Sequence, residues 1–140
     1  VQTCALPISR GLQTPCGRTL SDRFRSRSGG WEVVRVNSDP VRIHQGLLLS
    51  GEKLIDSREF RDQLVHTFPT ALGGEMEGVG AYAAADRCNT EIILVKSICD
   101  WADGHKNDRA QPFAAFTAVS LVHHVLSKPG VLAALSATDI

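Results

Sequence analysis

Apolar and polar positions follow two different periods along the part of the chain that begins at Trp31. Short runs rich in β-branched residues predict strands over residues 31–36, 41–49 and 91–98. The third run is the most apolar, with Ile92-Ile93-Leu94-Val95 at its centre. The apolar positions near the end of the second run favour a strand that is buried on both faces.

Longer patterns between and after these runs predict three helices. The first follows Asp56, which can cap a helix while Glu59 completes the reciprocal hydrogen bond, and it stops before Pro69. The second covers residues 78–88, where Gly and Ala favour close packing on a sheet, and the third covers residues 111–126. The expected apolar face of the first helix consists of Phe60, Leu64 and Val65.

Strands that alternate with helices predict an α/β domain with a largely parallel sheet and helices on its faces. Ligands in such folds bind beyond the carboxyl ends of the strands. We therefore looked for candidate chemistry in the polar segments that follow the predicted strands.

The first thirty residues do not fit this alternating pattern. Residues 1–8 match, residue for residue, one reading frame of a common sequencing adapter, so we expect them to be absent from the natural protein. The stretch up to residue 30 is rich in Arg, Ser and Gly and has no apolar period, which is typical of disorder. A basic arm for nucleic acid is the alternative. We predict an adapter-derived or disordered segment at 1–30, a partial domain at 31–128 and a tail at 129–140.

Charge and cysteine spacing exclude several classes of function. The 140 residues have no net charge, but residues 1–30 hold five Arg and one Asp, so the remainder is acidic and gives no sign of nucleic-acid binding. No apolar run reaches the ~18 residues that a membrane span needs, and we expect a cytoplasmic protein. The cysteines at 4, 16, 88 and 99 lack metal-ligand spacing, so neither a disulfide framework nor a zinc site is indicated, and we expect no cofactor.

Two acidic segments lie where an α/β fold places its ligands. In Gly73-Gly74-Glu75-Met76-Glu77-Gly78, at a predicted helix start, the two carboxylates are too close in sequence to share one helix face, so we expect different roles for them. The simpler interpretation is helix capping. Asp100 directly follows the most apolar strand, where α/β enzymes often place an acid or base. A turn is the simpler interpretation there, and it fits the rival Asp103-Gly104 best.

These segments together carry a resemblance to a known family. Residues 49–55, 75–78 and 95–100 resemble the carboxyl-terminal half of the nucleoside phosphorylase superfamily, and within it the methylthioadenosine/S-adenosylhomocysteine nucleosidases. The sequences of residues 73–78 and 98–106 are most similar to those of phosphorylase-like domains that occur fused to signalling NTPases in some bacteria and fungi. The resemblance implies a three-layer α/β/α fold with a mixed central sheet, and a homo-oligomer for the full-length protein.

The resemblance also implies a reaction, cleavage of the bond between a purine and ribose through an oxocarbenium-like transition state. By similarity, Glu77 would accept hydrogen bonds from the ribose hydroxyls, Met76 would pack against the sugar, and Asp100 would protonate the purine N7. Residues 54 and 55 would line the base pocket. The resemblance therefore gives Asp100 as catalytic and Leu54, Ile55, Glu75, Met76 and Glu77 as substrate-binding residues.

The chain departs from the nucleosidase pattern at three positions. Leu54 stands where an aromatic usually stacks on the base, Cys99 stands where Ser often precedes the acid, and Lys96 replaces an Arg. The half of the family fold that carries the phosphate loop or the water-activating glutamate is absent, so hydrolysis and phosphorolysis, with phosphate as second reactant, both stay open. We expect this chain to be inactive by itself.

Two other functions stay open at this point. One is a nucleotide-sensing or effector module with the same fold, within a multidomain protein linked to a signalling NTPase. The other is a plain α/β domain in which the acidic segments are fortuitous.

Overall fold

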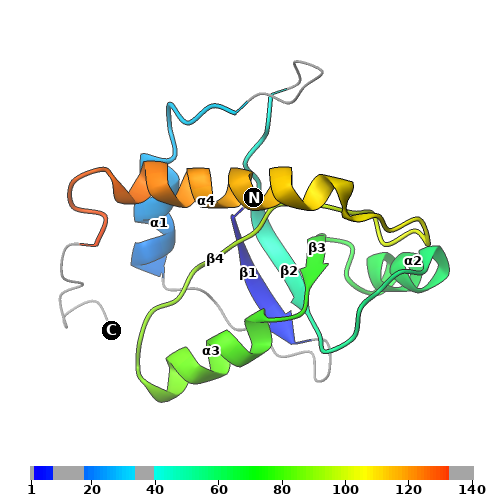
Figure 1. Ribbon diagram of the computed structural model, residues 1–140. Helices are drawn as coiled ribbons and strands as arrows, with labels where there is room; N and C mark the ends of the chain where they lie inside the picture. Colours follow the sequence, from blue (N-terminus) through cyan, green and yellow to red (C-terminus); the bar gives the residue numbers. More distant parts are fainter. Residues whose placement is uncertain (1, 8–17, 34–39, 133–140) are drawn as a thin grey trace.

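The computed structural model describes residues 2–7, 18–33 and 40–132. Strands and helices alternate through most of this part of the chain, with a 3₁₀ turn before the last helix (Figure 1). The elements are β1 (Gln2–Pro7), α1 (Arg18–Arg27), β2 (Gln45–Ser50), α2 (Arg58–Thr67), β3 (Ala71–Glu75), α3 (Gly78–Arg87), β4 (Leu94–Val95), the 3₁₀ turn (Asp108–Ala110) and α4 (Gln111–Leu126).

The strands form one mixed sheet in the order β3-β2-β1-β4. β1, β2 and β3 run parallel, whereas β4 pairs antiparallel with β1. In the register of β2 and β3, Ser50 lies opposite Glu75. The carboxyl ends of these two strands therefore meet at one edge of the sheet, where the fold class predicts a ligand site.

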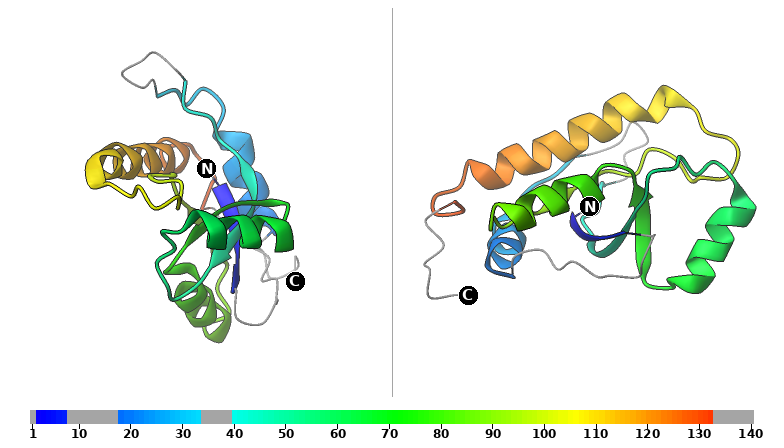
Figure 2. Two further views of the ribbon diagram at one scale, coloured as in Figure 1. Left: turned by 90° about the vertical axis from the view of Figure 1, so that its right-hand side faces the viewer. Right: turned by 90° about the horizontal axis from the view of Figure 1, so that it is seen from below.

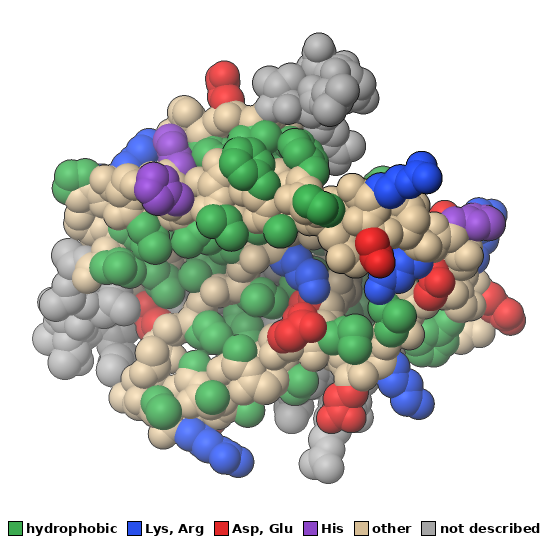
Figure 3. All heavy atoms as spheres, viewed as in Figure 1, with side chains coloured by type: hydrophobic (Ala, Val, Ile, Leu, Met, Phe, Trp, Pro, Cys, Tyr) green, Lys and Arg blue, Asp and Glu red, His purple; other side chains and the backbone are tan. Residues whose placement is uncertain are grey.

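The longest helix, α4, crosses the sheet in Figure 1 and stands to one side of it in Figure 2. Its buried residues, Ala114, Thr117, Leu121 and Val125, recur every three or four positions and so form one stripe. Phe116 and Val119 lie off this stripe and stay exposed, in line with the hydrophobic side chains visible over α4 in Figure 3. No helix in the described part of the chain is long and apolar enough to cross a membrane.

Helix α1 lies in a segment that we expected to be disordered. Phe24 is only 2% exposed and forms a buried cluster with Leu121, Val125 and Val131. Ser21 is buried on the same face, one helical turn earlier. A single aromatic and a serine give no apolar period, so only the contact with α4 reveals this helix. Val131 likewise joins the core from the predicted tail.

Strand β1 places residues 2–7 in the sheet, beside both β2 and β4. Its register with β2 is continuous from one end of the strand to the other. The adapter origin of residues 1–8 and the proposed domain bounds stay predictions.

Strand boundaries differ from the sequence-based expectation at four places. β2 begins at Gln45 and ends at Ser50, whereas the predicted strand covered 41–49. Residues 31–33 are not in a strand, and the indole N–H of Trp31 donates instead to Ser120 Oγ at 3.1 Å; residues 34–36 lie outside the described ranges. β4 is limited to Leu94–Val95, because only these residues pair with β1. Residues 71–75, expected to be a connection, form β3 against β2.

The predicted start and apolar face of α2 are corrected by the structure. The N-cap is Ser57, whose side chain accepts from Phe60 N, whereas Asp56 accepts from the backbone of Gly104 at 3.0 Å. Phe60 and Val65 are exposed, and α2 buries no residue. Helix periodicity fixes which residues share a face, but it does not supply an element to cover that face.

We expect Phe24→Ala to lower the free energy of unfolding by about 3–5 kcal/mol, because it leaves a cavity between α1 and α4. The matched control is Phe116→Ala, whose side chain is 59% exposed and should change stability by less than about 1 kcal/mol. Urea unfolding followed by circular dichroism measures both. Equal effects of the two substitutions would show that α1 does not pack as described.

Candidate functional site

A cavity of about 470 Å³ lies at the carboxyl ends of β2 and β3. Three segments line it: residues 49–55 after β2, residues 71–77 along and after β3, and residues 96–102 after β4. Arg61, Leu64 and Val65 of α2 add a further wall. The cavity therefore depends on segments that are distant in the sequence.

All six residues predicted from the sequence for the site line this one cavity. Leu54 and Ile55 come from the first segment, the acidic pair and its methionine from the second, and Asp100 from the third. The structure thus brings the predicted set together, while the role of each residue toward a substrate stays a prediction. The set is Leu54, Ile55, Glu75, Met76, Glu77 and Asp100.

The buried carboxylate of Glu75 binds the backbone at the start of α3. Its side chain is buried, and its Oε2 accepts hydrogen bonds from the backbone N–H groups of Glu77 at 2.7 Å and Gly78 at 2.6 Å. Ser50 Oγ accepts from Val79 N at 2.8 Å. These acceptors satisfy N–H groups that would otherwise have no partner at a helix start. The capping interpretation therefore holds for Glu75.

The other carboxylate of this segment, that of Glu77, faces outward. Its side chain is 79% exposed, and Oε2 lies 3.6 Å from Lys96 Nζ. Met76 N donates to the same oxygen at 3.4 Å. The two carboxylates therefore differ in their surroundings: that of Glu75 is buried and bonded to the backbone, and that of Glu77 is exposed beside the cavity.

Asp100 is half-buried, and both of its carboxylate oxygens are oriented by neighbours. Oδ1 accepts from Ala102 N at 3.0 Å, and Oδ2 accepts from the Cys99 thiol at 3.6 Å. Ala102 has a φ of +51°, a conformation that costs free energy for a residue with a Cβ and is held here by this hydrogen bond. Burial raises the pKa of the Cys99 thiol above its ordinary value, and the neighbouring Asp100 carboxylate raises it further.

Two hydrogen bonds join the loop after β4 to the region between β2 and β3. Arg61 Nη1 donates to the carbonyl oxygen of Trp101 at 3.1 Å, and Gly104 N donates to Asp56 Oδ1 at 3.0 Å. The sequence reasoning selected neither Arg61 nor Trp101 for the site; the position of Trp101 next to Asp100 was the only signal. Asp103 accepts from His105 N at 3.1 Å in a turn and does not line the cavity.

Charges of both signs surround the cavity. Lys53, Arg61, Lys96 and Lys106 line it together with the acidic residues already described. On the face seen in Figure 3, acidic and basic side chains are likewise interspersed. Within the described ranges, no three His, Cys, Asp or Glu side chains come close enough to hold a metal ion.

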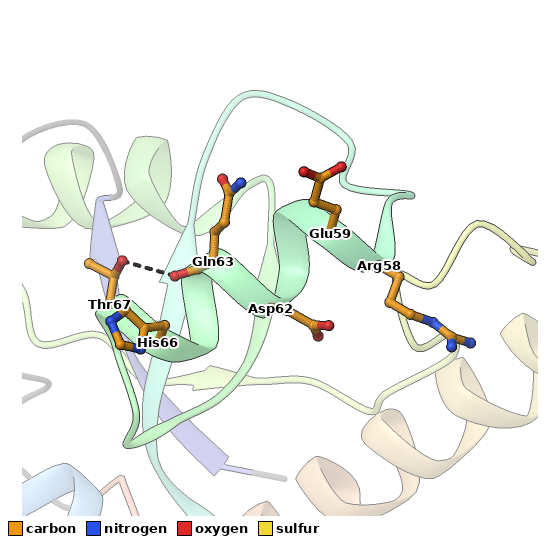
Figure 4. Close-up of a pocket in the computed structure, with 6 residues that line it drawn as sticks. All are labelled: Arg58, Glu59, Asp62, Gln63, His66 and Thr67. Carbon is orange, nitrogen blue, oxygen red and sulfur yellow. Dashed lines mark hydrogen bonds between the residues drawn. The ribbon is translucent and has the colours of Figure 1, made fainter.

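A larger hollow of about 860 Å³ runs along α2 and is a weaker candidate. One helix contributes every residue that lines it, and the labelled side chains in Figure 4 point in several directions instead of converging. The one hydrogen bond drawn there runs from Thr67 Oγ1 to Gln63 O, at 2.9 Å. An open surface of this kind cannot exclude water from a reaction. The lining residues are Arg58, Glu59, Asp62, Gln63, His66 and Thr67.

Comparison with known families gives a match over most of the chain. The model of the phosphorylase superfamily matches residues 13–127. A death domain-containing ATP nucleosidase from Amphimedon queenslandica is 39% identical over 92 residues, which are 64% of this chain and 17% of that protein. A 5′-methylthioadenosine/S-adenosylhomocysteine nucleosidase from Maridesulfovibrio salexigens is 34% identical over 65 residues, 46% of this chain and 28% of that protein.

Solved structures support the same fold. The 5′-methylthioadenosine/S-adenosylhomocysteine nucleosidase of Neisseria meningitidis, in complex with methylthio-immucillin-A, aligns with a TM-score of 0.67 at 17% identity. The alignment covers 89% of this chain and 58% of the Neisseria meningitidis chain. The S-adenosylhomocysteine nucleosidase of Streptococcus pyogenes, in complex with 5-methylthiotubericidin, gives a TM-score of 0.68 at 18% identity, over 89% and 56% of the two chains. This chain therefore spans little more than half of each solved structure, and its α/β fold is that of the nucleosidases.

We expect Gly78→Ala and Gly80→Ala, both in α3, to have opposite effects on stability. A Cβ at Gly78 would lie 2.5 Å from the buried Glu75 Oε1, so the capping carboxylate must move and stability should fall by about 1–3 kcal/mol. A Cβ at Gly80 meets nothing within 4 Å, so alanine should stabilise the helix by about 0.5–1 kcal/mol. Urea unfolding measures both; stabilisation by Gly78→Ala would contradict the capping role of Glu75.

We expect the Cys99 thiol to ionise at a higher pH than an ordinary cysteine thiol. Its raised pKa moves the pH midpoint of alkylation by iodoacetamide upward, since only the thiolate reacts. Asp100→Asn removes a negative charge beside Cys99, so it should shift this midpoint down without affecting Cys88. Peptide mass spectrometry over a pH series separates the two cysteines. A Cys99 midpoint unmoved by Asp100→Asn would show that the two side chains do not interact.

Proposed function

Because this chain belongs to the phosphorylase superfamily, we propose that it supplies the acid and the ribose- and base-contacting residues of a site that cleaves the N-glycosidic bond of a purine nucleoside. One observation supports this most strongly. A single cavity is lined by an oriented carboxyl group, an outward-facing carboxylate and apolar side chains, which are the three kinds of group that the reaction requires.

Asp100 is the proposed general acid. A purine anion is a poor leaving group, so the carboxyl proton passes to N7 while the electron pair of the bond between the sugar and N9 moves onto the purine. The hydrogen bonds from Ala102 N and the Cys99 thiol fix the direction in which this carboxyl group points. The resulting oxocarbenium ion is then captured by water or phosphate.

Glu77 is the proposed ribose ligand. An exposed carboxylate at the cavity can accept hydrogen bonds from two neighbouring hydroxyl groups at once. Lys96, at 3.6 Å, favours one orientation of this carboxylate, and Met76 beside it offers an apolar surface to the sugar. Leu54 and Ile55 would contact the base from the segment after β2.

The relatives support an adenine-containing substrate. They are named as nucleosidases of ATP or of methylthioadenosine and S-adenosylhomocysteine, and one structural relative is bound to adenine. Lys53 and Lys106 at the cavity would suit the phosphates of a nucleotide. Adenosine, methylthioadenosine and ATP are therefore the substrates to compare first. The resemblance further supports a homo-oligomer in the cytoplasm.

A nucleotide-sensing or effector module is the second candidate. The match covers only 17% of the Amphimedon queenslandica ATP nucleosidase, whose name includes a death domain, so a phosphorylase-like domain can occur within a much longer protein. A sensor would bind the nucleotide and leave it intact, whereas an enzyme releases free adenine. Chromatography of the reaction mixture for adenine separates the two functions.

We expect Asp100→Asn in the full-length protein to lower kcat on a purine nucleoside by ~10²–10⁴, because the amide keeps the shape and loses the acid. A nitrophenyl riboside, whose leaving group needs no proton, should be much less affected. Adenine release measured by chromatography and nitrophenol release measured by absorbance give the two rates.

The matched control for this experiment is Asp103→Asn, which makes the same change three residues further along the loop, at a residue that does not line the cavity. It should leave both rates within about twofold of the parent protein. Equal losses on the nucleoside and the nitrophenyl riboside in Asp100→Asn would point to a structural role for Asp100 and contradict the assignment.

A further inference from the structure

Trp101 is the one aromatic side chain among the described residues that line the cavity. It is 74% exposed, more than any other large hydrophobic side chain in the described ranges. Ligand cavities are lined mainly by apolar and aromatic side chains, so an indole in the wall of this cavity can contact a bound ligand. The other tryptophan, Trp31, lies against the hydrophobic core and donates its indole N–H to Ser120.

The backbone around Trp101 is held on both sides. Its carbonyl oxygen accepts from Arg61 Nη1 at 3.1 Å, and the next residue, Ala102, is held by Asp100 Oδ1 at 3.0 Å. Gly104 N is bonded to Asp56 Oδ1 at 3.0 Å slightly further along the loop. The indole is therefore presented at the cavity by a fixed backbone, and its exposure does not come from a loose chain end.

We infer that Trp101 stacks on the purine base of the substrate. This inference rests on the proposed function, because it takes Asp100 to lie within hydrogen-bond reach of N7, about 3 Å. Consecutive Cα atoms are about 3.8 Å apart, so an indole on the next residue is long enough to reach the face of a base held there. Both side chains line the same cavity.

The other apolar side chains that line the cavity are less suited than Trp101 to stack on a base. Leu54 and Met76 are exposed large side chains that also line the cavity, and neither has a flat face for a base. Indole offers the largest flat apolar surface of any side chain. Stacking does not distinguish one purine from another, because every base has the same kind of flat face and its edge groups are not contacted. Trp101 would therefore contribute affinity for the base, and discrimination would come from polar groups elsewhere.

Tryptophan fluorescence tests this inference directly, because the chain contains only two tryptophans. Adenosine should quench the emission of the parent protein and of Trp31→Phe, in which Trp101 alone emits. The quenching should be lost in Trp101→Phe. Quenching that survives in Trp101→Phe, or none in Trp31→Phe, would overturn the stacking.

Equilibrium dialysis with labelled adenosine gives the energetic test. Trp101→Ala should weaken binding by about 5- to 100-fold, the range for loss of one stacked aromatic, and Trp101→Phe should retain much of the affinity. The matched control is Phe116→Ala, an exposed aromatic of α4 that does not line the cavity, which should bind within about twofold of the parent. Equal binding by Trp101→Ala and the control would overturn the inference.

Adenine release, measured in the full-length protein, separates this inference from the proposed function. Quenching and binding that depend on Trp101, without release of adenine from any nucleoside, would overturn the enzymatic proposal and leave the stacking intact. Adenine release with a KM that Trp101→Ala leaves unchanged would overturn the stacking and leave the enzymatic proposal intact. A parent protein that neither binds adenosine nor releases adenine would overturn both.

Discussion

The buried carboxylate of Glu75 is the interaction on which the geometry of the cavity depends. It meets the first N–H groups of α3, and Ser50 Oγ meets the next one. Because Ser50 and Glu75 end neighbouring parallel strands, these bonds fix the first turn of α3 to the edge of the sheet. Glu77 begins that turn, so the direction of its exposed carboxylate is set by the sheet behind it. Gly78 is favoured there because a Cβ would collide with Oε1, the second oxygen of the capping carboxylate.

The opposite side of the cavity is held by longer-range contacts. The loop after β4 carries Asp100 and Trp101, and it is joined to the region between β2 and β3 through Arg61 and Asp56. Neither bond is strong by itself, since both are exposed to solvent. Together they fix the spacing between the acid and the apolar segment that would contact the base. Residues of the same type thus have different roles in this site: one carboxylate caps a helix, one faces outward and one is oriented by two donors.

Local patterns predicted the elements whose stabilising interactions are local. The bounds of α4 match the predicted 111–126, and α3 ends one residue before its predicted end. β2 covers the second half of its predicted strand and extends one residue beyond it. Predictions failed where a distant partner decides the outcome. β4 is as short as its pairing with β1 allows, and α1 is held by the contact of Phe24 with α4.

The sequence by itself determined the family resemblance, and this resemblance supplied the set of side chains for the site. Local spacing pointed only to the acidic residues after a strand and at a helix start. It left open whether Glu75 caps a helix or binds a ligand, and it did not select Trp101. Only the tertiary structure shows that Glu75 is buried with its carboxylate bonded to the start of α3, and that Trp101 lies at a cavity built from three distant segments. The physical reason is that burial and hydrogen-bond partners depend on neighbours in space, which spacing along the chain does not specify.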